Sequence, residues 1–296
     1  IINCNGKIEM YGEKFHCWEK KGHGRVNMRT AIKRSCDVYF YEVARLLGVD
    51  RLSKTAEKFG LGKKVLVDFL EERSGVVPNT KWKKKYIGQN WYIGETLHSG
   101  IGQGYYLTTP LQLCLMTAQI ANGGYRITPK IISDSTDRRN DLEKYLKNKD
   151  ENIFNPLTNP FVSNFDQQKL FRNQENINFI KDAMYGATNE PGGTSYRSRF
   201  KSEKFMFAGK TGSSQIKKFT ELQRESEVKQ NEIVYGDRDH AWFVAFAPVK
   251  NPKYAISVLV EHGGSGSSAA APIAKKVIKK TLERHEARSS KNGEEI

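Results

Sequence analysis

Two strand-like runs near the end of the chain constrain its fold most strongly. Residues 241–248 alternate small and bulky apolar side chains, and residues 254–261 repeat the pattern after Asn251-Pro252, which is a turn signal. Apolar residues then recur at helical spacing over 270–285. Two adjacent strands joined by a short turn and followed by a long helix predict an antiparallel sheet with helices packed against it, an α+β fold.

The other apolar patterns predict mainly helices, and Pro110 stands in the first turn of one of them, where its missing N–H costs nothing. Helices are predicted over residues 27–48, 53–59, 109–122 and 176–186. Irregular structure is predicted for the polar residues 1–24, the Gly-, Pro- and Lys-rich residues 60–109 and a charged surface insertion over 133–165.

Charge and hydropathy exclude several classes of function. The chain has 48 basic and 33 acidic residues, a net charge of +15, which would hold an anionic surface nearby. The lysines are spread along the chain, however, and Lys275 to Lys280 lie opposite the apolar face of a predicted helix, so no specific nucleic-acid binding is predicted. The longest apolar run, 241–249, is far shorter than the roughly 20 residues that span a membrane.

Lys210-Thr211-Gly212 is the first motif that carries chemistry, at the end of a third strand-like run over 205–208. In serine acyltransferases, a lysine attracts the substrate carboxylate, a hydroxyl bonds to it, and a glycine lets the substrate backbone approach the strand. The second element of that chemistry is a Ser-x-Asn or Ser-x-Asp at a helix boundary, and Ser35-Cys36-Asp37 has this form.

Five segments extend the pattern over nearly the whole chain: SCDVYFYEVA at 35–44, GQGYYLTTPLQL at 102–113, KTGSSQ at 210–215, DHAWFVAFAP at 239–248 and VEHGGSGSSAAAPI at 260–273. In this order they resemble the class B penicillin-binding proteins, most nearly the penicillin-binding protein 2 group that acts in cell elongation. The resemblance implies a transpeptidase fold of the serine β-lactamase-like kind, an antiparallel sheet flanked by helices.

The resemblance also implies an activity, D,D-transpeptidation of peptidoglycan, in which stem peptides are cross-linked by acyl transfer and which β-lactams block as mimics of D-Ala–D-Ala. It implies that Ser35 belongs to the proton relay to the leaving group and that Asp37 holds this segment. Lys210 and Thr211 would bind the substrate carboxylate, and the backbone N–H of Ser213 would be one of two oxyanion donors.

One element of the family pattern is missing from this sequence. The family's nucleophile lies in a Ser-x-x-Lys motif before the Ser-x-Asp segment, yet none of the 34 residues before Ser35 is a serine. The same spacing at Ser198/Lys201 and Ser214/Lys217 follows Ser35 and is interpreted as accidental. We therefore expect that the chain is the C-terminal part of a transpeptidase domain, without the nucleophile helix and the membrane anchor, and is inactive alone.

Cys4, Cys17, His23 and Cys36 form a second constellation, separated by 12, 5 and 12 residues. Three thiolates and an imidazole suit a closed, structural zinc site. The resemblance supports this, because His23 and Cys36 align with a histidine and a cysteine of a zinc site in the penicillin-binding protein 2 group, whereas Cys4 and Cys17 replace aspartates. Disulfides are the alternative in an oxidising compartment, and four cysteines allow three pairings.

Plainer interpretations exist for single residues. Ser35 is also suited to be the N-cap of the following helix, and Cys114 is expected to be a buried, inert side chain of the helix over 109–122. Trp242, Phe243 and Phe246 are expected to pack the strand against the C-terminal helix.

The sequence thus predicts a transpeptidase domain over residues 1–286 and a charged tail over 287–296. The implied partners are peptidoglycan stem peptides, β-lactams and the SEDS-type glycosyltransferase of the rod complex, on the periplasmic side of the bacterial inner membrane. The alternative function is a zinc-stabilised basic binding module that keeps the fold without catalysis. The assignment requires the ammonium of Lys210 and the hydroxyl of Ser35 to face each other across a shared cleft.

Overall fold

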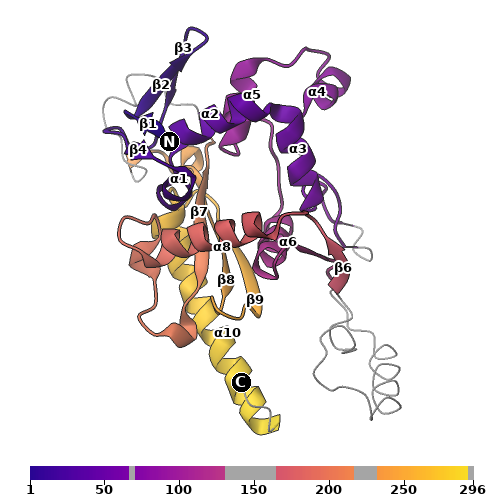
Figure 1. Ribbon diagram of the computed structural model, residues 1–296, viewed down its shortest axis with the longest axis vertical. Helices are drawn as coiled ribbons and strands as arrows, with labels where there is room; N and C mark the ends of the chain where they lie inside the picture. Colours follow the sequence, from indigo (N-terminus) through magenta and orange to yellow (C-terminus); the bar gives the residue numbers. More distant parts are fainter. Residues whose placement is uncertain (67–70, 131–164, 217–231, 293–296) are drawn as a thin grey trace.

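The computed structural model describes residues 1–66, 71–130, 165–216 and 232–292. Its centre is an antiparallel sheet in the strand order β7-β8-β9, formed by Ala208–Ser214, His240–Ala247 and Tyr254–Val260 (Figure 1). With helix α10 (Ala271–Asn292) packed on it, the sheet confirms the predicted α+β fold. No helix within these described ranges is long and apolar enough to cross a membrane.

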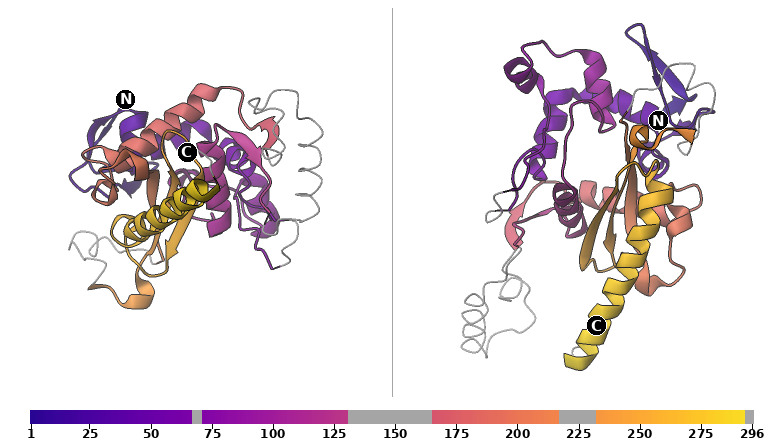
Figure 2. Two further views of the ribbon diagram at one scale, coloured as in Figure 1. Left: turned by 90° about the horizontal axis from the view of Figure 1, so that it is seen from below. Right: turned by 180° about the vertical axis from the view of Figure 1, so that it is seen from behind.

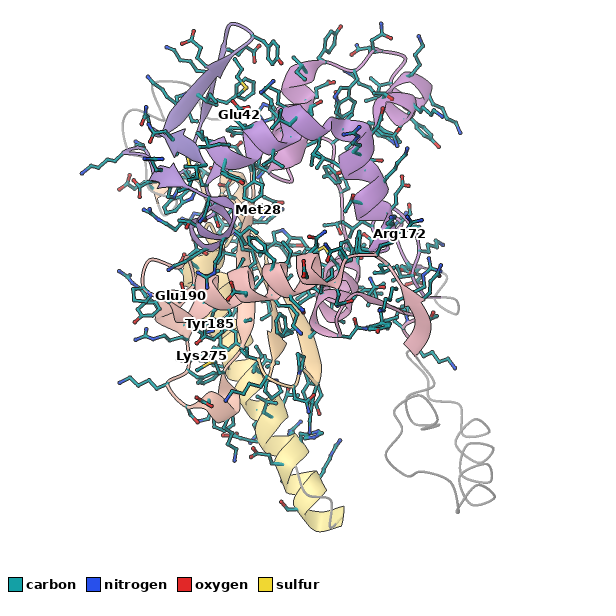
Figure 3. All side chains as sticks on the ribbon, viewed as in Figure 1. Met28, Glu42, Arg172, Tyr185, Glu190 and Lys275 are labelled. Carbon is teal, nitrogen blue, oxygen red and sulfur yellow. The ribbon has the colours of Figure 1, made fainter. Side chains whose placement is uncertain are left out.

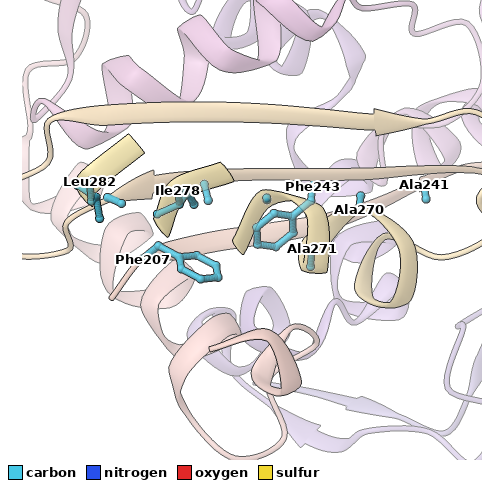
Figure 4. Close-up of a cluster of buried hydrophobic side chains, with 10 residues drawn as sticks. Phe207, Ala241, Phe243, Ala270, Ala271, Ile278 and Leu282 are labelled. Carbon is cyan, nitrogen blue, oxygen red and sulfur yellow. The ribbon is translucent and has the colours of Figure 1, made fainter. Parts of the chain in front are cut away.

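Helix α10 covers one face of the sheet because every second residue of β8 points toward it (Figure 2). Phe243 is the largest of these β8 side chains, and Ile278 of the helix belongs to the same buried cluster (Figure 4). The other β8 residues that face α10 are alanines, which let the helix approach the sheet closely. The shared cluster contains Phe207, Ala241, Phe243, Ala245, Ala247, Ala270, Ala271, Ala274, Ile278 and Leu282.

The opposite face of the sheet is covered by α6 (Pro110–Ala121) and α8 (Gln174–Asn189). Phe246 packs here, with Ile120 and Met184, and not against α10 as the sequence predicted. The prediction failed because successive side chains of a strand point to opposite faces of the sheet. Phe243 and Phe246 are three positions apart, so they lie on opposite faces. At the outer end of α6, β5 (Tyr125–Ile127) pairs with β6 (Phe165–Lys169).

The N-terminal residues form two small ribbons where irregular structure was predicted. β1 (Ile2–Cys4) pairs with β4 (Gly24–Val26), and β2 (Lys7–Met10) pairs with β3 (Glu13–His16) in a hairpin at the top of Figure 1. These strands have three or four residues each and mostly polar sequences, too short for a period-two pattern to be visible.

The single helix predicted over 27–48 is two helices, α1 (Met28–Arg34) and α2 (Asp37–Leu47), which break at Ser35-Cys36. Gly48 ends α2 as predicted. Ser35 caps the C-terminus of α1 and Cys36 is the N-cap of α2, so the interpretation of Ser35 as an N-cap is wrong.

The region predicted as a loop over 60–109 contains two short helices, α4 (Thr80–Tyr86) and α5 (Ile93–Gly100), and follows α3 (Val49–Lys58). A buried ion pair between Lys83 Nζ and Glu95 Oε1, 2.5 Å apart, joins α4 to α5. Lys83 is fully buried and its ammonium also lies 4.5 Å from the ring centre of Tyr92. Helices of seven and eight residues held by such a contact leave little local signal.

Lys210-Thr211-Gly212 lies inside β7, whereas the sequence placed it after a strand over 205–208. The helix predicted over 176–186 is longer at both ends, and α10 continues past 285 to Asn292. The predicted insertion over 133–165 lies outside the described residues, apart from its last residue in β6.

Candidate active site

Ser35 and Lys210 touch, although 175 residues separate them in the sequence. Lys210 Nζ donates a hydrogen bond to Ser35 Oγ and another, of 3.0 Å, to the carbonyl oxygen of Thr211. Lys210 belongs to β7 and Ser35 to the break between α1 and α2. The prediction that these two groups face each other is therefore confirmed, while the catalytic roles implied by the resemblance stay predictions.

The backbone of Ser35 is left-handed, with φ 53° and ψ 53°, a conformation that is unfavourable for residues with a Cβ. Two contacts hold it. Its N–H bonds back to Ile32 O at 3.3 Å, and Trp18 Nε1 donates to Ser35 O at 2.7 Å and to Arg34 O at 3.1 Å. An unfavourable conformation fixed by its surroundings is typical of functional sites.

Lys210 is a partly buried lysine whose ammonium lies against Ser35. Its burial lowers the pKa of Lys210 to about 8, since desolvation disfavours the charged form, and the charge of Asp37 opposes this only in part. A lysine with such a pKa releases and regains a proton more readily near neutral pH than an exposed lysine does. The ammonium is thus suited to exchange a proton with the hydroxyl that it touches.

Asp37 lies at the start of α2, beside the site but not in hydrogen-bond contact with Ser35. Its Oδ2 accepts from the Trp18 backbone N–H at 2.8 Å, which ties α2 to the segment after β3. Burial raises the pKa of Asp37 to about 7, and the charge of Cys17 adds to this effect. This geometry agrees with the predicted role of holding the Ser35 segment.

Thr211 and Gly212, the rest of the Lys-Thr-Gly motif, follow Lys210 on β7. Thr211 Oγ1 donates to Thr194 Oγ1 at 3.0 Å. Gly212 has little room for a side chain, because a Cβ there would lie 3.3 Å from Cβ of Trp242 on β8. Gly212 and Ser213 are exposed, so the backbone of this part of β7 can be approached by a ligand.

A network of charges fixes α1, which carries Ser35 at its end, to α8. Arg29 bonds to Asp182 at 2.5 Å and to Glu190 at 2.6 Å, and Lys33 bonds to Glu190 at 2.7 Å. Figure 3 labels Glu190 at the end of α8, close to Met28 at the start of α1. The sequence analysis missed these residues because partners more than 150 positions apart leave no local pattern.

The four predicted zinc ligands are brought together. The ligand atoms of Cys4, Cys17, His23 and Cys36 all lie within 4.8 Å of one another, and all four residues are buried. His23 Nδ1 is 3.5 Å from Cys17 Sγ and 3.7 Å from Cys4 Sγ. None of the chain's four cysteines forms a disulfide, and Cys114 is only partly buried, at the contact between α6 and β9.

This donor set fits a tetrahedral metal ion. Three thiols and an imidazole converge in a buried space, and His23 Nε2 is buried there without a hydrogen-bond partner. The Cys36 thiol bonds to Cys17, which lowers the pKa of Cys17 to about 4 and raises the pKa of Cys36. One thiolate is therefore favoured even before a cation is considered, and a bound divalent cation favours thiolates further.

Most of the chain is similar to proteins of one family. The penicillin binding protein transpeptidase domain family matches residues 1–279. Peptidoglycan D,D-transpeptidase MrdA of Salmonella typhimurium is 33% identical over 261 residues, which cover 88% of this chain and 39% of that protein. The chain therefore spans well under half of the length of such a relative.

Two solved structures are similar over nearly the whole chain. The penicillin-binding protein PBP2 of Helicobacter pylori, in a complex with MreC, has a TM-score of 0.73 and 33% identity, and covers 95% of this chain and 45% of that one. PBP2 of Pseudomonas aeruginosa, in complex with WCK 5153, has a TM-score of 0.72 and 33% identity, and covers 94% of this chain and 55% of that one.

Proposed function

Because the chain belongs to the penicillin-binding protein transpeptidase domain family, we propose that it supplies the carboxylate-binding strand and the proton relay of a peptidoglycan D,D-transpeptidase. The hydrogen bond between Lys210 and Ser35 carries this proposal, because it joins the two motifs whose chemistry must meet. A binding module without catalysis would not need a buried lysine against a strained serine, so this alternative is less well supported.

Substrate recognition falls to β7. Lys210 and the Thr211 hydroxyl bind the terminal carboxylate of a stem peptide, and the outward-facing backbone at Ser213, which is exposed, pairs with the peptide. The Ser213 N–H then points at the oxygen of the scissile carbonyl and stabilises its developing negative charge.

The reaction is acyl transfer in two steps. In the first, a serine oxygen bonds to the penultimate D-Ala carbonyl carbon, the C–N bond breaks, and D-Ala leaves with a proton on its amine. In the second, an amine of a neighbouring stem peptide attacks the ester, and the serine regains its proton. Ser35 passes the proton to the leaving amine and Lys210 replenishes it, since the two are already hydrogen-bonded.

The attacking serine is proposed to lie outside these residues. No serine precedes Ser35. Of the Ser-x-x-Lys matches that follow, Ser198 is buried in a 3-10 turn, Ser214 lies on β7 with Lys217 outside the described residues, and Ser226/Lys229 lies wholly outside them. We expect the 296 residues alone not to react with penicillin.

A structural zinc ion is proposed at Cys4, Cys17, His23 and Cys36, where it would supply a covalent-like cross-link and no step of the reaction. Cys36 directly follows Ser35, so the four ligands tie the relay serine to β1 and to the segment between β3 and β4. Besides the cysteines, the ribbons bury two apolar side chains, Phe15 and Val26, in the same cluster.

The proposed setting follows from the relatives. Peptidoglycan synthesis implies the periplasmic side of the inner membrane, and the implied partners are stem peptides, β-lactams and a rod-complex glycosyltransferase of the SEDS type. The similar PBP2 of Helicobacter pylori was solved with MreC, so an MreC-like partner of the intact protein is included.

The test is covalent labelling with a fluorescent penicillin. The intact protein should form a stable adduct that hydroxylamine removes, and the isolated residues 1–296 should not. An intact protein that is folded but never labelled contradicts the proposed function. An adduct on the isolated chain contradicts the placement of the nucleophile.

A further inference from the structure

The free edge of β7 is defined by the direction of its backbone groups. β7 pairs with β8 on one side, and within the described residues no strand pairs with the other side. In an antiparallel ladder, alternate residues direct both N–H and C=O to the same neighbour. Side chains bond to the backbone of Gly209, Thr211, Ser213 and Gln215, so these alternate residues face away from β8.

Two side chains close the ends of this edge. At the start, Thr188 of α8 accepts from Gly209 N at 3.0 Å. At the far end, Gln103 Nε2 donates to Ser213 O at 2.8 Å, and Gln103 Oε1 accepts from Gln215 N at 3.4 Å. The backbone N–H groups of Thr211 and Ser213 lie between these two ends.

The side-chain amide of Gln103 has the hydrogen-bonding pattern of a peptide group in a neighbouring strand. It gives an N–H to one residue of β7 and takes an N–H from the residue two positions further on, as a paired backbone would. Both of these bonds lie beyond the Ser213 N–H along the edge of β7.

The proposed function sets the direction of a bound stem peptide. Its carboxylate lies at Lys210 and Thr211 and its scissile carbonyl at the Ser213 N–H, so the peptide runs antiparallel to β7. The N–H of the scissile residue then reaches Ser213 O, and the carbonyl oxygen of the residue two positions before it reaches Gln215 N. Gln103 already holds both of these positions.

We propose that Gln103 is a specificity-determining residue, a stand-in for the amide N–H of the acyl donor that a donor must displace from Ser213 O. The inference rests on the proposed function. It applies to donors that carry an amide next to the reacting carbonyl, because only these compete with Gln103 for the edge. Donors without this amide bind while Gln103 stays in place.

A pair of penicillins isolates the effect. Benzylpenicillin carries an acylated amine next to the β-lactam carbonyl, and 6-aminopenicillanic acid carries a free amine there. The measurement is the second-order rate of acylation of the intact protein by each compound, expressed as the ratio of the two rates. The ratio does not depend on the fraction of protein that is active, so partial misfolding of a variant does not affect it.

Gln103→Ala should raise the ratio of benzylpenicillin to 6-aminopenicillanic acid by about threefold to tenfold, the worth of one hydrogen bond. Gln103→Glu, which still accepts from Gln215 but cannot donate to Ser213, should raise it by a similar amount. Gln89→Ala is the matched control, since Gln89 is also exposed and lies on the loop after α4. Its ratio should equal that of the unaltered protein.

A ratio that is unchanged or lower in Gln103→Ala overturns the inference and leaves the proposed function standing. An unaltered, folded protein that reacts with neither penicillin contradicts the proposed function itself and the inference with it.

Discussion

Trp18 holds Ser35: the indole Nε1 donates to Ser35 O at 2.7 Å, and the Trp18 backbone N–H donates to Asp37 at 2.8 Å. Trp18 directly follows Cys17, one of the four clustered residues that are proposed to bind zinc. The position of the serine that faces Lys210 is thus coupled to the order of the cysteine segment. A defect in the cluster should therefore appear as a defect at the candidate active site.

Replacing Trp18 with Phe should impair acylation more than stability. The ring remains, but the bonds to Ser35 O and Arg34 O are lost, so the left-handed Ser35 is less well fixed. We expect a loss of about 1 kcal/mol in the free energy of unfolding and a fall of roughly tenfold in the penicillin acylation rate of the intact protein.

Trp91→Phe is the control, because the Trp91 indole donates instead to Thr96 Oγ1 at 2.8 Å. It should cost similar stability with little change in rate. Equal rate losses in both variants would show that the Trp18 contact has no special effect on Ser35.

Metal removal should unfold the N-terminal ribbons. Purified protein should contain about one zinc ion per chain, and a strong chelator should lower its melting temperature. Structural zinc is worth ~10–16 kcal/mol in small metal-folded peptides, and here it would join segments whose strands have only three or four residues each. Metal analysis and thermal unfolding before and after chelation check this.

Cys17→Ser should abolish zinc binding, whereas Cys114→Ser, remote from the cluster, should keep it. Protein without metal and without free thiols would contradict the zinc proposal and favour disulfides.

Acid should weaken the contact between α1 and α8. Arg29 and Lys33 lower the pKa of Glu190 to about 2 in the folded protein. A carboxylate with a lowered pKa stabilises the fold above its unfolded pKa, near 4.5, and this contribution disappears as the pH falls from there toward 2. Since Glu190 is partly exposed, we expect about 1–2 kcal/mol.

Glu190→Gln should lose this stability at pH 7, and its free energy of unfolding should depend less on pH between 5 and 2. Urea unfolding at each pH measures this. Glu203→Gln, which breaks an exposed pair with Lys250, should leave the free energy of unfolding almost unchanged. An unchanged pH dependence in Glu190→Gln would refute the role of this network.

The elements that sequence patterns predicted are those whose signals are local. β8, β9 and α6 have periodic apolar residues and distinct ends, such as Thr109 and Pro110 at the start of α6. β1 to β4 were missed because these short strands have no visible apolar periodicity. Their cysteines and histidine instead pack together from separate segments. The break of the predicted helix at Ser35 was missed since left-handed backbone at a serine has no sequence signature.

The candidate site was predictable only in part. Lys210, Ser35 and the metal-ligand set were identified through the motifs and the family resemblance. Gln103 lies in one of the resembling segments, yet its contact with β7 depends on the placement of a loop 110 positions away. Thr194 and Glu190 act through tertiary contacts that no spacing encodes.

Breaking the Lys83–Glu95 pair should be costly, because it leaves a charge without its partner in a buried position. Lys83 is fully buried, and Tyr105 also bonds to Glu95 at 3.3 Å. Lys83→Met should lower the free energy of unfolding by about 3 kcal/mol, and Lys83→Met with Glu95→Gln should recover part of this loss. Urea unfolding measures both. A double variant that loses the sum of the single losses would contradict the pairing.

One double-mutant cycle tests the central relationship most directly. In the intact protein, Ser35→Ala and Lys210→Met should each slow penicillin acylation by roughly a hundredfold or more. If the two side chains act as one unit, the double variant should be about as slow as the slower single variant. A double variant slowed by the product of the two single effects would show that Ser35 and Lys210 act independently.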